Sequence, residues 1–141
     1  MRIRAPLTLL LLTASTAAIL WDPARLGARR LVRSWAARVA VAGRSMEPAL
    51  KDGDWVLVDP DAFRARRPIA GDLVLAPDPR EPERVLIKRV AAVSRDGRLS
   101  IMGDAPLAST DSREFGTIDA ADVRGRPWFR YWPPERLGPL R

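Results

Sequence analysis

The chain has 141 residues, of which 47% are hydrophobic and 29% charged, and its formal net charge is +7. It contains no histidine and no cysteine, which excludes Ser-His-Asp triads, Cys-His dyads and zinc sites built from those ligands. We expect neither a metal ion nor a cofactor. Six arginines lie between Asp22 and Glu47 without an acidic residue among them, and the rest of the chain carries only +1. This asymmetry predicts a local basic collar rather than a nucleic-acid-binding face.

The stretch from Ala5 to Trp21 is 17 residues long and uncharged, which predicts a membrane helix within an anchor at residues 1–24. At 1.5 Å per residue it would span about 25 Å, slightly less than a bilayer core. A cleavable signal peptide is the alternative, with Ser15-Thr16-Ala17 as a weak cleavage site. Because the apolar run continues through Ile19-Leu20-Trp21, the anchor is favoured. A buried helix of a soluble protein is a third possibility.

Residues 25–38 form a basic juxtamembrane segment. Leu31, Val32, Trp35 and Val39 fall roughly on one helical face, which suits a helix lying among anionic lipid headgroups. A solvated basic linker remains the alternative, because Gly27 and the unbroken positive charge both weaken a helix.

From Val39 onward short β-branched runs alternate with turn sequences, which predicts a small, mainly β domain at residues 39–135. Two alternatives stay open for its last segment, Trp128 to Trp132: contact with a membrane interface, or core packing as a final strand. Alternation within a final strand would bury Trp128 and expose Phe129 and Tyr131. Strands are expected at 39–42, 54–58, 72–76, 84–93, 98–102 and 122–131.

Ser45 is the candidate nucleophile. Gly43 allows a close approach of the backbone to a substrate, and Pro48 fixes the chain direction after the serine. A hydroxyl needs a base, and in a chain without histidine that base would be one of the two lysines, Lys51 or Lys88. Taken alone, the segment could also be an ordinary polar turn.

Lys88 is the better candidate base, because strand alternation places it on one face with Leu86 and Val90. A lysine must be neutral to accept a proton, and an apolar face, helped by the charge of Arg89, would lower its pKa. Lys51 has acidic neighbours that would keep it charged. The alternative for Lys88 is an ordinary lysine that reaches water from the end of a strand.

A loop rich in hydroxyl groups, Gly103 to Gly116, includes a possible ion pair between Asp111 and Arg113. Together the segments form an ordered series of motifs, and this series resembles the type I signal peptidase (leader peptidase) family of Ser/Lys proteases. The motifs are Gly43-x-Ser45-Met46-x-Pro48, Gly53-Asp54, Lys88-Arg89-Val90, Gly103-Asp104 and Ser109-x-Asp111-Ser112-Arg113-x-x-Gly116.

The resemblance implies a small β catalytic domain after one N-terminal transmembrane helix, and a serine endopeptidase that needs no cofactor. Ser45 would attack the scissile bond, Lys88 would act as general base and then acid, and Ser109 would orient the lysine. Asp111 and Arg113 would hold the loop. The remaining motif residues would support the site without taking part in the reaction, namely Gly43, Met46, Pro48, Asp104 and Ser112. Substrates would be precursor proteins with small residues at the first and third positions before the cut.

Two positions depart from the family pattern. Many members carry a hydroxyl residue two places before the nucleophile, where this chain has Gly43, and the usual Gly-Asp-Asn reads Gly103-Asp104-Ala105. The first departure leaves the Ser45 N–H as the main donor to an oxyanion.

The expected function is removal of N-terminal signal or leader peptides at the cell membrane by a single-pass protein. One alternative is a maturation peptidase that trims one enzyme precursor, as in the nickel superoxide dismutase type, which this short chain resembles. Two others are a catalytically idle, membrane-tethered binding module and a self-cleaving repressor. The repressor would need a DNA-binding domain, whereas residues 1–38 are expected to hold an anchor instead. More arginines follow the expected anchor than precede it, which favours a cytoplasmic domain, whereas the family resemblance implies an outward-facing one. The side of the membrane stays open.

Overall fold

The computed structural model describes residues 23–141, so the expected membrane helix at Ala5–Trp21 lies outside the described residues. Residues 33–141 form one compact unit. Across residues 23–141, no helix is both long and apolar enough to cross a membrane. The expected basic segment 25–38 is helical as far as Ala36, in α2 (Pro23–Ala36), whereas Val39, expected on the same helical face, lies in the first strand. Its placement among lipid headgroups remains a prediction.

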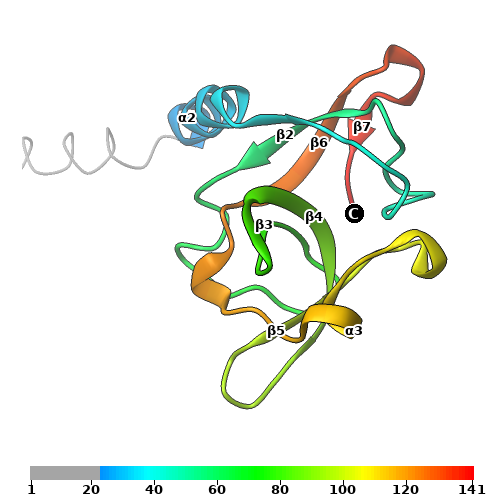
Figure 1. Ribbon diagram of the computed structural model, residues 1–141. Helices are drawn as coiled ribbons and strands as arrows, with labels where there is room; N and C mark the ends of the chain where they lie inside the picture. The colour runs from blue at the N-terminus through cyan, green and yellow to red at the C-terminus, as the bar shows by residue number, and fades with distance from the viewer. Residues whose placement is uncertain (1–22) are drawn as a thin grey trace, which may run out of the picture. The chain divides into compact units, whose positions relative to one another are not determined.

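The compact unit is built from two antiparallel sheets (Figure 1), which confirms the mainly β prediction. One sheet has the order β1-β2-β6-β7, and its strands are β1 (Arg38–Ala40), β2 (Trp55–Asp59), β6 (Arg126–Trp132) and β7 (Gly138–Pro139). The other has the order β3-β4-β5, with β3 (Leu73–Asp78), the long β4 (Glu81–Val93) and β5 (Leu99–Met102).

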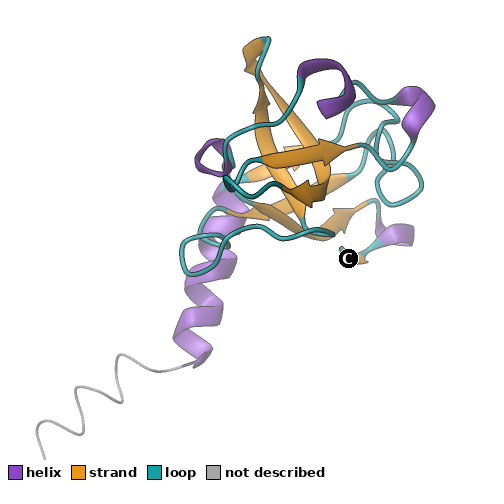
Figure 2. Cartoon of the chain, turned by 90° about the horizontal axis from the view of Figure 1, so that it is seen from below, coloured by secondary structure: helices purple, strands orange, loops and turns teal. Residues whose placement is uncertain are grey.

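Short helical turns and loops surround the strands (Figure 2). The turns are η1 (Pro106–Ala108), α3 (Ser112–Phe115), η2 (Ala120–Asp122) and η3 (Pro134–Arg136). The two sheets are joined where Leu75 of β3 exchanges backbone hydrogen bonds with the segment before β6, accepting from Arg124 at 2.7 Å and donating to Gly125 at 2.9 Å. Gly125 is required there because a Cβ would lie 2.7 Å from the Asp59 carbonyl oxygen.

All six expected strands are present, with ends that differ from the prediction by a few residues. Strand β7 was not predicted from the sequence, because a two-residue Gly-Pro strand has neither alternation nor β-branched residues. It pairs with β6 and thereby helps to cover Phe129, which is partly buried.

The expected exposure of Phe129 and Tyr131 was wrong, since both are partly buried, as is Trp128. Tyr131 packs against Trp35 and Trp55, with ring centroids 5.3 and 6.4 Å away. Alternation predicts exposure only when one face of a strand meets water, whereas here aromatic side chains from neighbouring segments cover part of both faces.

Two apolar clusters form the core. The first contains Met46 and Leu50 from the loop after β1, so buried side chains anchor this loop on the C-terminal side of Ser45. Its other members are Val41, Val56, Val58, Leu73, Leu75 and Leu140. The second cluster joins the sheet of β3, β4 and β5 to the segment around Ile118; its buried members are Val74, Ala76, Val90, Leu99, Ile101 and Ile118.

A buried carboxylate, that of Asp54, also holds the loop between β1 and β2 in place. Asp54 is 1% exposed and accepts hydrogen bonds from the Lys51 backbone N–H at 2.9 Å and from Arg136 at 2.9 Å. Arg130 pairs with Asp54 at 3.5 Å and also donates to the Ala49 carbonyl at 2.9 Å. The C-terminal segment therefore secures the loop that follows Ser45.

We expect Asp54→Ala to lower the free energy of unfolding by about 2–4 kcal/mol, because it leaves two arginines without their shared, buried partner. Urea unfolding of the whole chain measures the change. The control is Asp122→Ala, an exposed carboxylate for which we expect a change within about 0.5 kcal/mol. Equal effects of the two substitutions would show that the Asp54 contacts do not stabilise the fold.

Candidate active site

Ser45 lies in a tightly bonded loop between β1 and β2. Gly43 has φ +88°, a left-handed conformation that favours glycine, and its N–H donates to Asp52 Oδ1 at 2.8 Å. Met46, next to the serine, is only 2% exposed. The loop therefore presents the partly buried Ser45 from a fixed backbone.

Lys88 lies in the middle of β4, between β3 and β5. Leu86, Lys88 and Val90 are all buried, which confirms the face predicted from alternation, and Lys88 is only 3% exposed. Burial lowers the pKa of Lys88 below its usual 10.5. The negative charge of Asp111 opposes this effect and the positive charges of Arg84 and Arg113 reinforce it.

Arg89 does not supply the positive charge near Lys88 that the sequence suggested. Its side chain forms a two-pronged ion pair with Asp104, at 2.9 and 2.8 Å, and also donates to the Gly71 carbonyl at 2.9 Å. Successive residues of a strand point to opposite faces, so Arg89 is directed away from Lys88.

Ser109 connects Lys88 to a buried carboxylate. The Lys88 amine donates to Ser109 Oγ at 3.0 Å, and the Ser109 hydroxyl donates to Asp111 Oδ2 at 2.6 Å. An ionised carboxylate can only accept, so the serine hydrogen points at Asp111 and the serine oxygen accepts from the amine. With one N–H used in this way, the lone pair of a neutral Lys88 is left for another partner.

Asp111 is fully buried and holds the whole loop. Besides Ser109 it accepts from the Gly103 N–H at 3.0 Å, and Arg113 donates two side-chain hydrogen bonds to it, both of 2.8 Å. Burial alone would raise the Asp111 pKa, but the hydrogen bonds from Arg113, Ser109 and the backbone outweigh it and hold the pKa well below its usual range. Asp111 therefore stays ionised, as the direction of the serine hydrogen requires.

Gly103 brings the Ser45 loop and the Ser109 loop together. A Cβ on Gly103 would lie 2.3 Å from Ser109 Oγ and 2.5 Å from the Ser45 carbonyl oxygen, so any side chain would force the two loops apart. The same carbonyl accepts from the Ala105 N–H at 2.9 Å. Ala105, the departure from the family pattern, thus contacts the Ser45 segment through its backbone.

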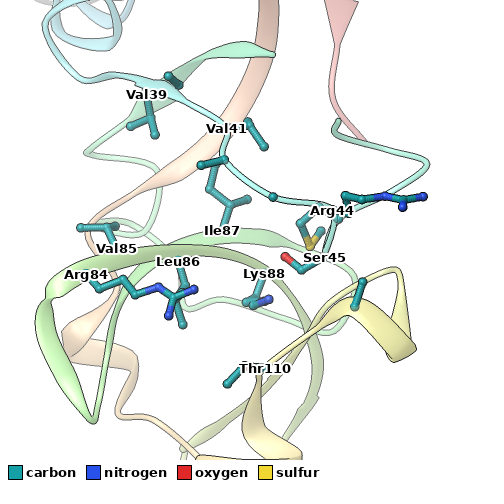
Figure 3. A pocket seen from close by; sticks show the side chains of 15 residues that line it. Val39, Val41, Arg44, Ser45, Arg84, Val85, Leu86, Ile87, Lys88 and Thr110 are labelled. Atoms are coloured by element: carbon teal, nitrogen blue, oxygen red, sulfur yellow. The ribbon is translucent and has the colours of Figure 1, made fainter. Parts of the chain in front are cut away.

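Ser45 and Lys88 line one cleft of about 300 Å³. Figure 3 shows both side chains facing into it, Ser45 from the loop and Lys88 from β4. Much of the remaining lining is apolar and comes from β1, from the residue just after it and from β4, namely Val39, Val41, Val85, Leu86 and Ile87.

The remaining expected site residues support the loops, with Gly43 and Met46 also on the cleft wall. The Pro48 carbonyl accepts from Arg136 at 3.4 Å, Asp104 pairs with Arg89, and Ser112 Oγ accepts from the Ile101 N–H at 2.8 Å. Lys51, the rival base, is exposed and does not line the cleft.

Sequence reasoning missed the structural roles of Gly103, Asp52 and Arg130. Gly103 is part of a predicted motif, but the sequence around it does not indicate that two loops distant in the chain approach each other there. Asp52 and Arg130 are ordinary charged residues in sequence, and only the fold shows that one caps Gly43 and the other holds the Ala49 carbonyl.

Comparison with known proteins assigns the family. Residues 23–96 match the model described as signal peptidase, peptidase S26. The mitochondrial ATP-independent inner membrane protease subunit 1a of Arabidopsis thaliana is 34% identical over 123 residues, covering 72% of this chain and 73% of that protein. The human mitochondrial inner membrane protease subunit 1 is 30% identical, covering 73% and 74%. Signal peptidase I of Streptococcus pneumoniae is 44% identical over 43 residues, 30% of this chain and 21% of that protein.

The fold and the family model together define a protease of the leader-peptidase class. The chain belongs to the signal peptidase family, peptidase S26.

We expect Gly103→Ala to lower peptide cleavage by about 100-fold, because displacing reacting groups by about 1 Å commonly has that effect. The control is Gly27→Ala, since among residues 23–141 no atom outside the neighbouring residues and backbone of its own helix lies within 4 Å of the added methyl group. Initial rates and far-ultraviolet circular dichroism are measured on both variants. A folded Gly103→Ala protein with the wild-type rate would contradict the close approach described above.

Proposed function

We propose that this protein is a membrane-anchored serine endopeptidase that removes N-terminal signal or leader peptides from precursor proteins. The observation that carries the proposal is a buried, desolvated lysine amine, tethered by Ser109, in the same cleft as Ser45. Burial lowers the pKa of this amine and so favours the neutral form, which can accept a proton.

In the proposed reaction, Ser45 Oγ attacks the scissile carbonyl carbon while its proton moves to Lys88 Nζ. Lys88 then gives this proton to the departing amine, and an ester between Ser45 and the leader peptide remains. A water molecule attacks the ester while Lys88 takes its proton, and Lys88 then returns this proton to Ser45 Oγ as the carboxyl end of the leader peptide departs. The hydrogen bond to Ser109 keeps the amine pointed in one direction throughout.

The backbone N–H of Ser45 is the proposed donor to the oxyanion. Within residues 23–141 it donates to no other group, whereas the Gly43 N–H is already bonded to Asp52. A hydroxyl side chain at position 43 would contribute a second donor in other members of the family. Here one backbone donor does this work.

Membrane attachment fits both the sequence and the relatives. Two of the relatives above are named inner membrane proteases, and the uncharged stretch at residues 5–21 would serve as a single-pass anchor at residues 1–24. The basic segment 25–38 would then contact anionic lipid, and residues 39–135 would act on precursors that have small residues before the cut. Comparing N-termini of cellular proteins with and without this protease would separate a general signal peptidase, with many clients, from a maturation peptidase with one.

Ser45→Ala and Lys88→Met should each abolish cleavage of a leader peptide, because nucleophile and base act as one unit. Each should leave circular dichroism unchanged. Lys51→Met is the matched control, an exposed lysine outside the cleft, and should keep the wild-type rate. The double variant should be no worse than either single one. Activity retained in Lys88→Met and lost in Lys51→Met would assign the base to the other lysine.

The pH dependence of kcat/KM should follow the deprotonation of Lys88. Because burial lowers its pKa, the rate should rise with pH and level off, with a midpoint below the 10.5 usual for lysine. The charge of Asp111 raises the Lys88 pKa, so Asp111→Asn should move the midpoint to lower pH while slowing the reaction through loss of the Ser109 tether. A rate that stays flat between about pH 6 and 9 would contradict a titrating lysine base.

A further inference from the structure

Two arginines line the cleft, and they differ in their partners. Arg44 forms an ion pair with Glu47 at 3.3 Å. Within residues 23–141, the Arg84 guanidinium forms no hydrogen bond and no ion pair shorter than 4 Å. Asp78 is the acid whose pKa responds to the Arg84 charge. Its pKa is lowered mainly by Arg80, which already binds it through two hydrogen bonds of 3.1 and 3.0 Å. Arg84 therefore presents an uncommitted positive charge to the cleft.

Arg84 is four residues before Lys88 on β4, and alternation puts both on the same side of the strand as Leu86. Figure 3 shows the Arg84 guanidinium beside Leu86, in the row that leads to Lys88. At 3.3 Å per residue the two side chains originate about 13 Å apart. A substrate extended along β4 has the same spacing, so Arg84 lies level with a substrate residue about three to five positions from the scissile bond.

The positive charge of the cleft favours an acidic side chain at that position of the substrate. None of the described lining residues is acidic, and three of them, Arg44, Arg84 and Lys88, carry basic groups. The forked guanidinium of an arginine matches a carboxylate in geometry as well as in charge. A lysine or arginine of the substrate at the same place would be repelled by the Arg84 charge.

We propose that Arg84 is a specificity residue that binds an aspartate or glutamate side chain of the substrate, about three to five residues from the scissile bond. The inference rests on the proposed function and narrows its substrate class. It distinguishes precursors that carry an acidic residue near the cut from those that are neutral or basic there.

The test uses the full-length protein and synthetic peptides with alanine at the first and third positions before the cut. One aspartate, or in the matched set one asparagine or lysine, is moved along the peptide on both sides of the cut. Wild type is compared with Arg84→Gln, Arg84→Glu and the control Arg95→Gln, an exposed arginine outside the cleft. Because Arg84 also lowers the pKa of Lys88, each variant is compared on the plateau of its own pH profile.

At one position, wild type and Arg95→Gln should cleave the aspartate peptide about tenfold faster in kcat/KM than the asparagine peptide, mainly through a lower KM. Arg84→Gln should bring this ratio close to one, and Arg84→Glu should favour the lysine peptide instead. An effect of Arg84 confined to the pH profile would leave the ratio unchanged and would overturn the inference.

Equal cleavage of the aspartate and asparagine peptides at every position by wild type would overturn the inference and leave the proposed function standing. A wild-type protein no more active than Ser45→Ala on any peptide would overturn the proposed function, and the inference with it. The two failures are thus distinguishable.

Discussion

The site depends on one buried charge, the carboxylate of Asp111. Completely removed from water, it is satisfied by Arg113, by the Gly103 N–H and by the Ser109 hydroxyl. These bonds keep it ionised, and an ionised carboxylate forces the Ser109 hydrogen toward itself. Toward Lys88 Nζ, the Ser109 oxygen can then act only as an acceptor. A carboxylate that does not line the cleft thereby fixes the direction of the amine that does.

Two opposing demands act on the same lysine. The proposed base must be neutral, which burial promotes, yet it lies near Asp111, whose charge favours the protonated form. Arg113 neutralises much of that charge through its hydrogen bonds, and Arg84 adds a second positive charge from the cleft side. In this arrangement Asp111 supplies orientation, and the positive charges of Arg84 and Arg113 oppose its effect on the Lys88 pKa. The same positive charge of Arg84 is also proposed to bind an acidic side chain of the substrate.

Much of this could be predicted from the sequence, because the signals involved are local. Alternation in β4 placed Lys88 with Leu86 and Val90, turn residues marked the strand ends, and the absence of histidine reduced the choice of base to two lysines. The missed features are long-range. Gly103 is needed because two loops distant in sequence meet there, and the side chain of Arg89 is committed to Asp104 rather than to Lys88. Contacts between residues that are distant in the sequence cannot be inferred from its local periodicity.

The most direct test of the central claim is the titration of Lys88 itself in the folded protein. With only two lysines in the chain, side-chain ¹⁵N labelling of lysine gives two signals, and a Lys88→Met variant assigns them. A neutral base predicts that the Lys88 signal changes at a pH below the 10.5 usual for lysine, and at a still lower pH in Asp111→Asn. A Lys88 signal that titrates at or above 10.5, unaffected by Asp111→Asn, would contradict a Ser45–Lys88 protease and favour a catalytically idle binding module.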